Sequence, residues 1–315
     1  MKEKVLVTGG AGYIGSHLSN ILLDAGYKVK VFDNLLYGQK LDANLSNNNS
    51  YEFINGDIRD VKLIEKSLQD VDYIVHLASL TGEPACLKNT ELCNSINTQA
   101  VQILNEVRSG LPIIFASSTS IYGETGKRHC TEETIPTPAL PYSISKYESE
   151  KLLSKSENVV IFRPATAFGI SFRHRLDLLI NDFVFNAVKY NLIKVYDPNV
   201  LRTFVSVQDL AKAYLLAIEK FKLFSGGIYN VGFDHLNLDK QTIVDEIKKQ
   251  TNCEVIVEKN RKDNDNRNFT VDYSKIKKLG FSETIGLVRG IDDMVRCYRE
   301  IISDPSHYCV NFNQI

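Results

Sequence analysis

The stretch VLVTGGAGYIGSHL, at residues 5–18, decides the fold of this 315-residue chain. The apolar run Val5–Val7 is typical of a buried strand, and a helical pattern follows the glycines. Glycine lets the backbone turn tightly and approach a pyrophosphate, while the N-terminus of the next helix offers free N–H groups to phosphate oxygens. The order of strand, glycine turn and helix predicts a dinucleotide site, with a plain tight turn as the alternative. The residues predicted to contact the dinucleotide here are Gly9, Gly12, Tyr13, Ile14 and Gly15.

Outward from this stretch, apolar runs alternate with helical patterns through the first half of the chain. Strands are predicted at Val5–Val7, Lys28–Phe32, Tyr51–Ile54, Tyr73–Leu77, Ile113–Ala116 and Val159–Phe162. Helices are predicted at Ile14–Ala25, Val61–Leu68, Asn97–Arg108 and Ser143–Leu153. The alternation indicates an α/β fold in which crossover helices wrap a parallel sheet.

The pattern changes after Gly169. Helices are predicted at Leu176–Tyr190, Asp209–Lys220, Lys240–Gln250 and Ile291–Ile302, with a short strand at Ile228–Val231 and a polar surface loop at Asn260–Asn268. We expect the chain to return to the first domain around Phe204–Gly232. The predicted domains are therefore residues 1–169 with 203–232, and residues 170–202 with 233–315.

Charge and cysteine content narrow the class of protein. Lysine and arginine number 37 against 38 aspartates and glutamates, so a net charge of −1 gives no electrostatic reason to expect nucleic acid or an anionic membrane as partner. No apolar run approaches the roughly 18 residues of a membrane helix, and the N-terminus lacks the pattern of a signal peptide. The six cysteines form no CxxC pair or zinc-binding spacing. We expect no metal site and the reduced thiols of a cytoplasmic protein.

Two carboxylates follow predicted strands and favour NAD as the dinucleotide. Asp33 ends the second strand, 18 residues after Gly15, where a carboxylate accepts hydrogen bonds from the adenosine ribose and repels a 2′-phosphate. No arginine follows it immediately, so NAD is favoured over NADP. Asp57, in NGDIRD, is expected near the adenine amino group. Both carboxylates could instead serve as caps. Their neighbours Asn34 and Ile58 are included in the predicted cofactor site.

A candidate catalytic pair lies in PYSISK, where Tyr142 and Lys146 are four residues apart and would share one helix face. A phenol has a reference pKa of about 10, and a nearby ammonium lowers it by stabilising the phenolate. A shift of about 3 units takes roughly 4 kcal/mol of differential interaction. Ser118, in FASSTSIYG 24 residues earlier, could orient a substrate hydroxyl toward Tyr142.

Taken together, the motifs resemble the extended short-chain dehydrogenases/reductases, a family of NAD-dependent nucleotide-sugar epimerases and dehydratases. They are GGAGYIGSH, Asp33, NGD, HLAS, SSTSIYG, YSISK and RPATAFG. The resemblance implies a Rossmann doubly wound parallel sheet with a smaller C-terminal substrate domain, and NAD as cofactor. It also implies a nucleotide-sugar substrate and a homodimer formed through Asn97–Arg108 and Ser143–Leu153.

The resemblance assigns roles to individual residues. It implies Tyr142 as base, Lys146 as its electrostatic partner and a ribose ligand, and Ser118 as the polar catalytic residue. On the nicotinamide side it implies Leu77, Ala78, Ser79 and Asn97. On the substrate side it places Arg202 on the pyrophosphate, where a planar guanidinium can bind two oxygens. Further substrate candidates are Thr81, Asn181 and Arg267, together with Arg173 and Arg175; His174 is read as a bystander.

Departures from the family pattern narrow the reaction. Sugar 4,6-dehydratases carry an acidic pair where this chain has Thr119 and Ser120, and aliphatic hydroxyls are unsuited to moving the protons of an elimination. Thr166 replaces the asparagine usual in galactose-type epimerases. The stretches LTGEPACLKN, FGISFRHRLDLLINDF and DNRNFTVD resemble a subgroup with GDP-heptose dehydrogenases.

The expected function is NAD-dependent oxidation at the C4 hydroxyl of a nucleotide-activated sugar. The sequence leaves open whether the enzyme is a C4 dehydrogenase or an epimerase, because it does not reveal whether the keto sugar rotates. The alternatives are a 4-keto-sugar reductase and a non-catalytic NAD(P)-sensing protein.

Overall fold

Seven parallel strands form the central sheet of the computed structural model, which describes residues 2–123, 128–259, 261, 267–303 and 309–310. The strand order is β12-β7-β5-β4-β1-β2-β3, so β1 lies inside the sheet and the chain winds outward from it on both sides. Their bounds are β1 Lys4–Thr8, β2 Lys28–Asp33, β3 Tyr51–Asn55, β4 Tyr73–His76, β5 Ile113–Ala116, β7 Val159–Pro164 and β12 Ile228–Val231. This confirms the predicted doubly wound parallel sheet.

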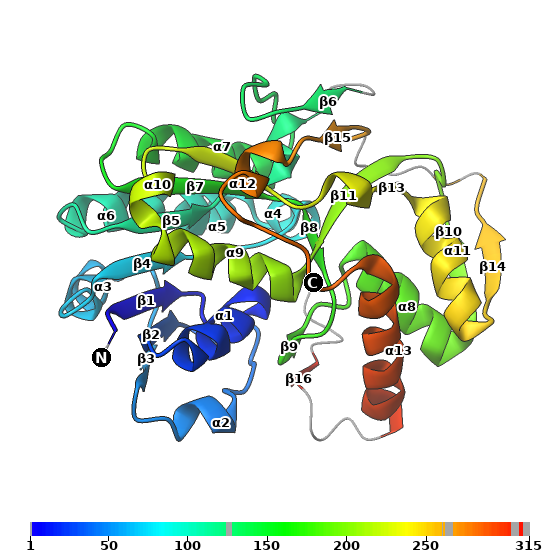
Figure 1. The fold of residues 1–315 in the computed structure, drawn as a ribbon, viewed down its shortest axis with the longest axis horizontal. Coiled ribbons are helices and arrows are strands. Elements are labelled where there is room, and N and C mark those ends of the chain that lie inside the picture. The colour runs from blue at the N-terminus through cyan, green and yellow to red at the C-terminus, as the bar shows by residue number, and fades with distance from the viewer. Residues whose placement is uncertain (1, 124–127, 260, 262–266, 304–308, 311–315) are drawn as a thin grey trace.

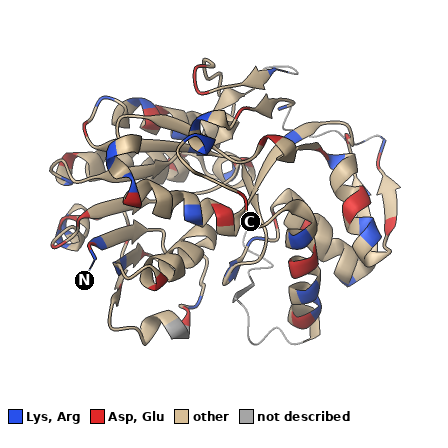
Figure 2. Ribbon diagram, in the orientation of Figure 1, with Lys and Arg blue, Asp and Glu red and all other residues tan. Residues whose placement is uncertain are grey.

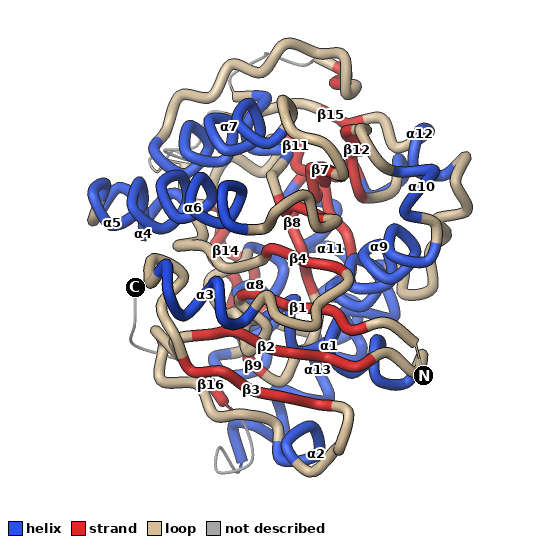
Figure 3. Tube along the Cα trace, turned by 90° about the vertical axis from the view of Figure 1, so that its left-hand side faces the viewer, coloured by secondary structure: helices blue, strands red, loops and turns tan. Residues whose placement is uncertain are grey.

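Helices cover both faces of the sheet (Figure 1, Figure 3). Since successive side chains on a strand point to opposite faces, Val5 and Val7 join the core beneath α1 and α9, whereas Leu6 joins the core beneath α3, α6 and α7. The bounds are α1 Tyr13–Asp24, α3 Val61–Ser67, α6 Ala100–Val107, α7 Pro141–Leu153 and α9 Val207–Glu219. The long apolar strands are thus buried on both sides, as expected for a parallel sheet.

Between β4 and β5 the structure differs from the predicted helix at Asn97–Arg108. Residues Ser95–Gln99 form a π-helical turn, and α6 begins only at Ala100. Two short helices that the sequence did not indicate precede it, α4 at Glu83–Lys88 and α5 at Thr90–Asn94. Asn97, inside this π-helical turn, accepts a hydrogen bond from the Leu80 nitrogen and donates one to the Leu80 carbonyl oxygen.

Besides the cores on the two faces of the central sheet, the second half of the chain contributes a separate core, around which a smaller unit is built (Figure 1). Its helices are α8 Leu179–Tyr190, α11 Lys240–Thr251 and α13 Leu287–Ser303. Two small sheets accompany them: β10 Leu192–Val195 with β14 Glu254–Val257, and β8 Thr166–Phe168 with β11 Leu201–Ser206 and β13 Asn237–Asp239. The helix predicted from Leu176 begins at Leu179, because Leu178 has extended backbone.

Shorter elements connect these units. They are α2 Ala43–Ser46, α10 Phe221–Phe224, α12 Ser274–Lys277, the 3₁₀ turns Thr119–Tyr122 and Asp234–Leu236, and the strand pairs β6 His129–Cys130 with β15 Thr270–Val271 and β9 Arg173–His174 with β16 Cys309–Val310. The core beneath α1 and α9 also includes three residues from the C-terminal part of the chain, Phe269, Val271 and Tyr273. The predicted domain bounds stay a prediction. The predicted loop at Asn260–Asn268 lies partly outside the described residues.

Acidic and basic residues are interleaved on the surface helices, as Figure 2 shows along α13. Within the described part of the chain, no helix is both long enough and apolar enough to cross a membrane.

A buried ion pair holds α7 against the sheet. Arg163, on β7, donates through Nε to both carboxylate oxygens of Glu150 at 3.2 Å, and its Nη2 also donates to Glu150. Ser117, just after β5, donates to the same carboxylate at 2.8 Å. Both charged side chains are 3% exposed, so water cannot replace either partner.

We predict that Glu150→Ala lowers the free energy of unfolding by about 3–5 kcal/mol, because the Arg163 guanidinium is left buried without its carboxylate. Urea unfolding at equilibrium measures this. Glu148→Ala is the control, since Glu148 is on the exposed side of α7 and pairs with Lys151; its effect should stay within about 0.5 kcal/mol. Equal stability of the two variants would contradict the assignment.

Candidate active site

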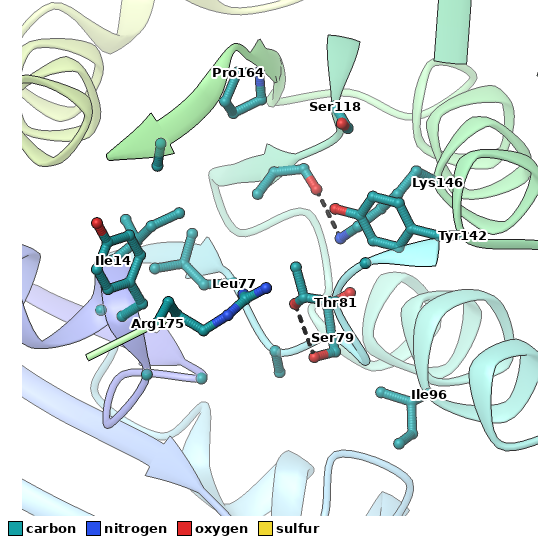
Figure 4. Close-up of a pocket in the computed structure, with 18 of the residues that line it drawn as sticks. Ile14, Leu77, Ser79, Thr81, Ile96, Ser118, Tyr142, Lys146, Pro164 and Arg175 are labelled. Atoms are coloured by element: carbon teal, nitrogen blue, oxygen red, sulfur yellow. Dashed lines mark hydrogen bonds between the residues drawn. The ribbon is translucent and has the colours of Figure 1, made fainter. Parts of the chain in front are cut away.

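A cavity of about 310 Å³ opens along the carboxyl ends of the central strands (Figure 4). It is lined by segments that follow β1, β2, β4, β5 and β7, together with the first turns of α1 and α7. The predicted site residues on its wall are Gly9, Gly12, Tyr13, Ile14, Gly15, Asp33, Asn34, Asp57, Ile58, Leu77, Ala78, Ser79, Thr81, Ser118, Tyr142, Lys146 and Arg267. Parallel topology explains why residues so far apart in sequence meet here.

The glycine turn at one end of the cavity fits a pyrophosphate. Gly9 has φ +71°, and a Cβ atom there would lie 2.6 Å from the backbone nitrogen of Ala78. A Cβ at Gly15 would lie 2.5 Å from the carbonyl oxygen of Gly9. Gly12 caps α1 without a side chain, and the first turn of α1 carries no acidic residue. The N–H groups of α1 therefore remain accessible to an anion at the cavity.

Asp33 lies at the end of β2, buried beside this turn. Its carboxylate accepts hydrogen bonds from the backbone nitrogens of Leu35 at 2.8 Å and Ala11 at 3.1 Å, and from Gln39 Nε2 at 3.3 Å. Burial raises the pKa of Asp33, while these two backbone bonds and the nearby charge of Arg173 act to lower it. The fixed carboxylate fits the predicted role on the adenosine ribose of NAD.

Asp57 lies on the wall beyond β3 and is paired within the protein. Arg59 donates to it through Nε at 2.8 Å and Nη2 at 2.6 Å, and Asn34 Nδ2 lies 3.4 Å from it. The hydrogen bonds from Arg59 lower the pKa of Asp57 to about 2. The contact of Asp57 with adenine stays a prediction.

Tyr142 and Lys146 occupy successive turns of α7, and both face the cavity (Figure 4). Lys146 Nζ donates to the Ala116 carbonyl oxygen at 2.9 Å and lies 5.9 Å from the centre of the Tyr142 ring. Ser118 follows β5 and lines the same part of the cavity. These three side chains come together as the sequence predicted.

Burial opposes ionisation of both members of the pair. It raises the pKa of Tyr142 well above that of a free phenol, while the charge of Arg175 and the hydrogen bond with Ser118 act to lower it. Burial also lowers the pKa of Lys146 to about 8. A bound cation, such as an oxidised nicotinamide, would therefore favour the phenolate.

Asn97 does not line the cavity. Its Oδ1 accepts from Ser79 Oγ at 3.0 Å and from the Leu80 nitrogen at 2.8 Å, and its Nδ2 donates to the Leu80 carbonyl oxygen at 2.9 Å and to Ser145 Oγ at 3.1 Å. The whole amide is used within the protein. Asn97 thereby holds the segment that forms the wall, and its contact with the cofactor stays a prediction.

Asn181 and Arg202 likewise lie behind the wall rather than on it. Asn181 accepts from the Gly169 nitrogen at 3.0 Å and donates to the Arg175 carbonyl oxygen at 2.9 Å. Arg202 donates to the carbonyl oxygens of Leu201, at 3.0 Å, and Arg267. In the structure both side chains are turned toward the segments that carry Arg175 and Arg267, and their contact with the substrate stays a prediction.

Three further charged side chains, those of Arg175, Glu83 and Arg173, lie on the cavity wall. Arg175, one of several candidates there, is paired with Asp177 through an Nε to Oδ1 bond of 2.6 Å. Glu83 begins α4, a helix that the sequence did not indicate, and Pro84 directly after it is common at a helix start. Arg173 also lines the cavity, with its guanidinium 4.1 Å from the centre of the Tyr37 ring.

Comparison with known proteins agrees with this arrangement. The model of the NAD-dependent epimerase/dehydratase family matches residues 5–232. The chain is 32% identical over 309 residues to a putative UDP-glucose 4-epimerase of Methanocaldococcus jannaschii, covering 92% of this chain and 97% of the relative. It is 30% identical to a probable UDP-arabinose 4-epimerase of Arabidopsis thaliana, covering 81% and 70%.

Among solved structures, the UDP-glucose 4-epimerase of Thermotoga maritima with UDP-glucose superposes with a TM-score of 0.84 at 27% identity, covering 95% of this chain and 99% of that one. The family match, the sheet order and the cavity agree, and the chain belongs to the NAD-dependent epimerase/dehydratase family.

Proposed function

We propose that this enzyme interconverts the C4 epimers of a nucleotide-activated sugar, with a UDP-sugar as the favoured substrate. The observation that carries the proposal is the meeting of Tyr142, Lys146 and Ser118 in the cavity that the glycine turn also lines. Relatives named as UDP-glucose and UDP-arabinose 4-epimerases support epimerisation and a UDP-sugar over the GDP-heptose dehydrogenation suggested by three sequence stretches.

The residues of the chain divide the chemistry among them. NAD, when bound, accepts the hydride from C4. Tyr142 removes the proton of the C4 hydroxyl, and Ser118 orients that hydroxyl toward the phenol. The Lys146 ammonium lies on the same helix face and favours the phenolate electrostatically. For epimerisation, the bound cofactor would also supply the hydride that is added to the other face of the 4-keto sugar.

Elimination of water is disfavoured by the groups on the wall. Thr119 Oγ1 donates to the Pro164 carbonyl oxygen at 3.1 Å, and neither Thr119 nor Ser120 can act as a base at neutral pH. The carboxylates among the described lining residues are Asp33, Asp57 and Glu83. The first two lie at the adenosine end, and Glu83 is engaged by backbone N–H groups.

We also propose a homodimeric assembly and a cytoplasmic location for this enzyme. We expect a homodimer formed through the outer faces of α6 and α7, where Ile144 is 42% exposed; sedimentation at micromolar concentration distinguishes it from a 35.5 kDa monomer. The five cysteines whose side chains are described are free thiols, which supports a cytoplasmic location. Fractionation of cells that express the protein would test this.

Tyr142→Phe is predicted to lower kcat by about 10²–10⁴ because it removes the proposed base while retaining the ring. The dissociation constant for NAD, measured by calorimetry, should stay within about threefold of the wild-type value. A variant that keeps more than roughly a tenth of the wild-type kcat would show that Tyr142 is not the base.

The products decide between epimerisation and dehydration. Incubation with UDP-glucose or UDP-arabinose in deuterated water should give the C4 epimer with its other oxygens intact. From UDP-glucose, a 6-deoxy-4-keto product carrying deuterium at C6 would overturn the proposal. Accumulation of an unreduced 4-keto sugar would identify a dehydrogenase instead of an epimerase.

A further inference from the structure

Glu83 reaches from α4 to the beginning of the catalytic helix α7. Its Oε2 accepts a hydrogen bond from the backbone nitrogen of Tyr142 at 2.9 Å, and its Oε1 accepts one from Ser143 at 3.1 Å. The first N–H groups of a helix have no partner within the helix. Leu140, at the N-cap of α7, has an apolar side chain, so a carboxylate from another segment satisfies these two groups.

We propose that Glu83 is a positioning residue for the reaction, which clamps the first turn of α7 and thereby fixes the Tyr142 phenol relative to the substrate. The proposal rests on the proposed role of Tyr142 as base. Glu83 acts through Tyr142 and is not itself assigned a proton transfer.

Opposing effects act on the charge of the Glu83 carboxylate. Burial raises its pKa, whereas the backbone N–H donors of Tyr142 and Ser143, the positive end of the helix dipole and the charge of Arg267 act to lower it. Both oxygens bond to adjacent N–H groups, which restricts the carboxylate to one orientation.

The clamp also joins two walls of the cavity. Glu83 directly follows the segment that carries Ser79 and Thr81, and all three residues line the cavity. The backbone atoms that it binds belong to the catalytic tyrosine and the next residue, 59 and 60 positions later in sequence. Glu83 therefore joins the sugar-side segment directly to the backbone of the residue that carries the phenol, beside the links that Asn97 makes to Leu80 and Ser145.

The charge of Glu83 also affects the pKa of the Tyr142 phenol, which an uncharged structural contact would not do. The ionisable groups that act on the Tyr142 phenol are Cys86, Arg175 and Glu83, with Lys146 across the ring. The negative charge of Glu83 raises the pKa of the phenol, so its removal should move the pH midpoint of kcat to lower values.

Glu83→Gln tests the clamp with little change in size. The amide offers one acceptor oxygen and directs an NH₂ group at the other backbone N–H. We expect kcat to fall roughly tenfold, while the KM for the sugar stays within about threefold, since displacement of a reacting group by about 1 Å costs up to about 10²-fold. Glu83→Ala should lower kcat further; if it does not fold, Glu83→Gln alone decides.

Hydrogen exchange of the NAD-loaded enzyme provides a readout that needs no substrate. Peptides that cover residues 140–147 should exchange faster in Glu83→Gln than in the wild type. Glu91→Gln, an exposed acid in the first turn of the neighbouring α5, is the matched control and should change neither exchange nor kcat.

In Glu83→Gln, a lower kcat, a lower pH midpoint and faster exchange together support the clamp, and a wild-type value for any of the three overturns it. If the wild-type enzyme turns over no nucleotide sugar, the proposed function fails, whereas exchange still tests whether Glu83 orders the first turn of α7.

Discussion

The structure depends on the parallel arrangement of the central strands, which sends every carboxyl end to one edge of the sheet. From β1 the chain winds to β2 and β3 on one side and to β4, β5, β7 and β12 on the other. The segments after β1 and β4 therefore diverge and leave a crevice. At its base the backbones touch, since a Cβ at Gly9 would lie 2.6 Å from the Ala78 nitrogen. The winding of the chain to both sides of β1 thus creates the crevice, and Gly9 keeps the floor of the crevice free of a side chain.

Buried polar contacts fix α7 along its whole length. Glu83 binds its first turn, Lys146 donates to the carbonyl oxygen of Ala116 one turn later, and Glu150 meets Ser117 and Arg163 after another. The first contact joins α7 to α4, and the other two join it to the end of β5 and to β7. In a buried environment such bonds are strong and costly to break. The base proposed here, Tyr142, would have to lie within hydrogen-bond distance of the C4 hydroxyl, and these contacts hold the helix that carries it.

Local patterns were sufficient to predict the sheet, and most of the predicted site residues line the cavity. The strands β1, β2 and β5 are short apolar runs because both faces are buried, and the glycine turn after β1 has no plausible substitute at φ +71°. By contrast, β14 has mostly exposed or half-exposed residues and carries no such signal. The roles of Asn181, Arg202 and Glu83 depend on contacts between segments distant in sequence, and residue type alone does not tell whether such a side chain faces the cavity or the protein.

The central claim is that the C4 hydrogen leaves as hydride and returns within one site to the opposite face of the sugar. The direct test uses UDP-glucose carrying deuterium at C4, incubated with the enzyme and NAD in ordinary water. The account predicts that the C4 epimer retains the deuterium at C4. An epimer with protium at C4 and the label in the solvent would contradict it, because the C–H bond would then have been broken by proton abstraction.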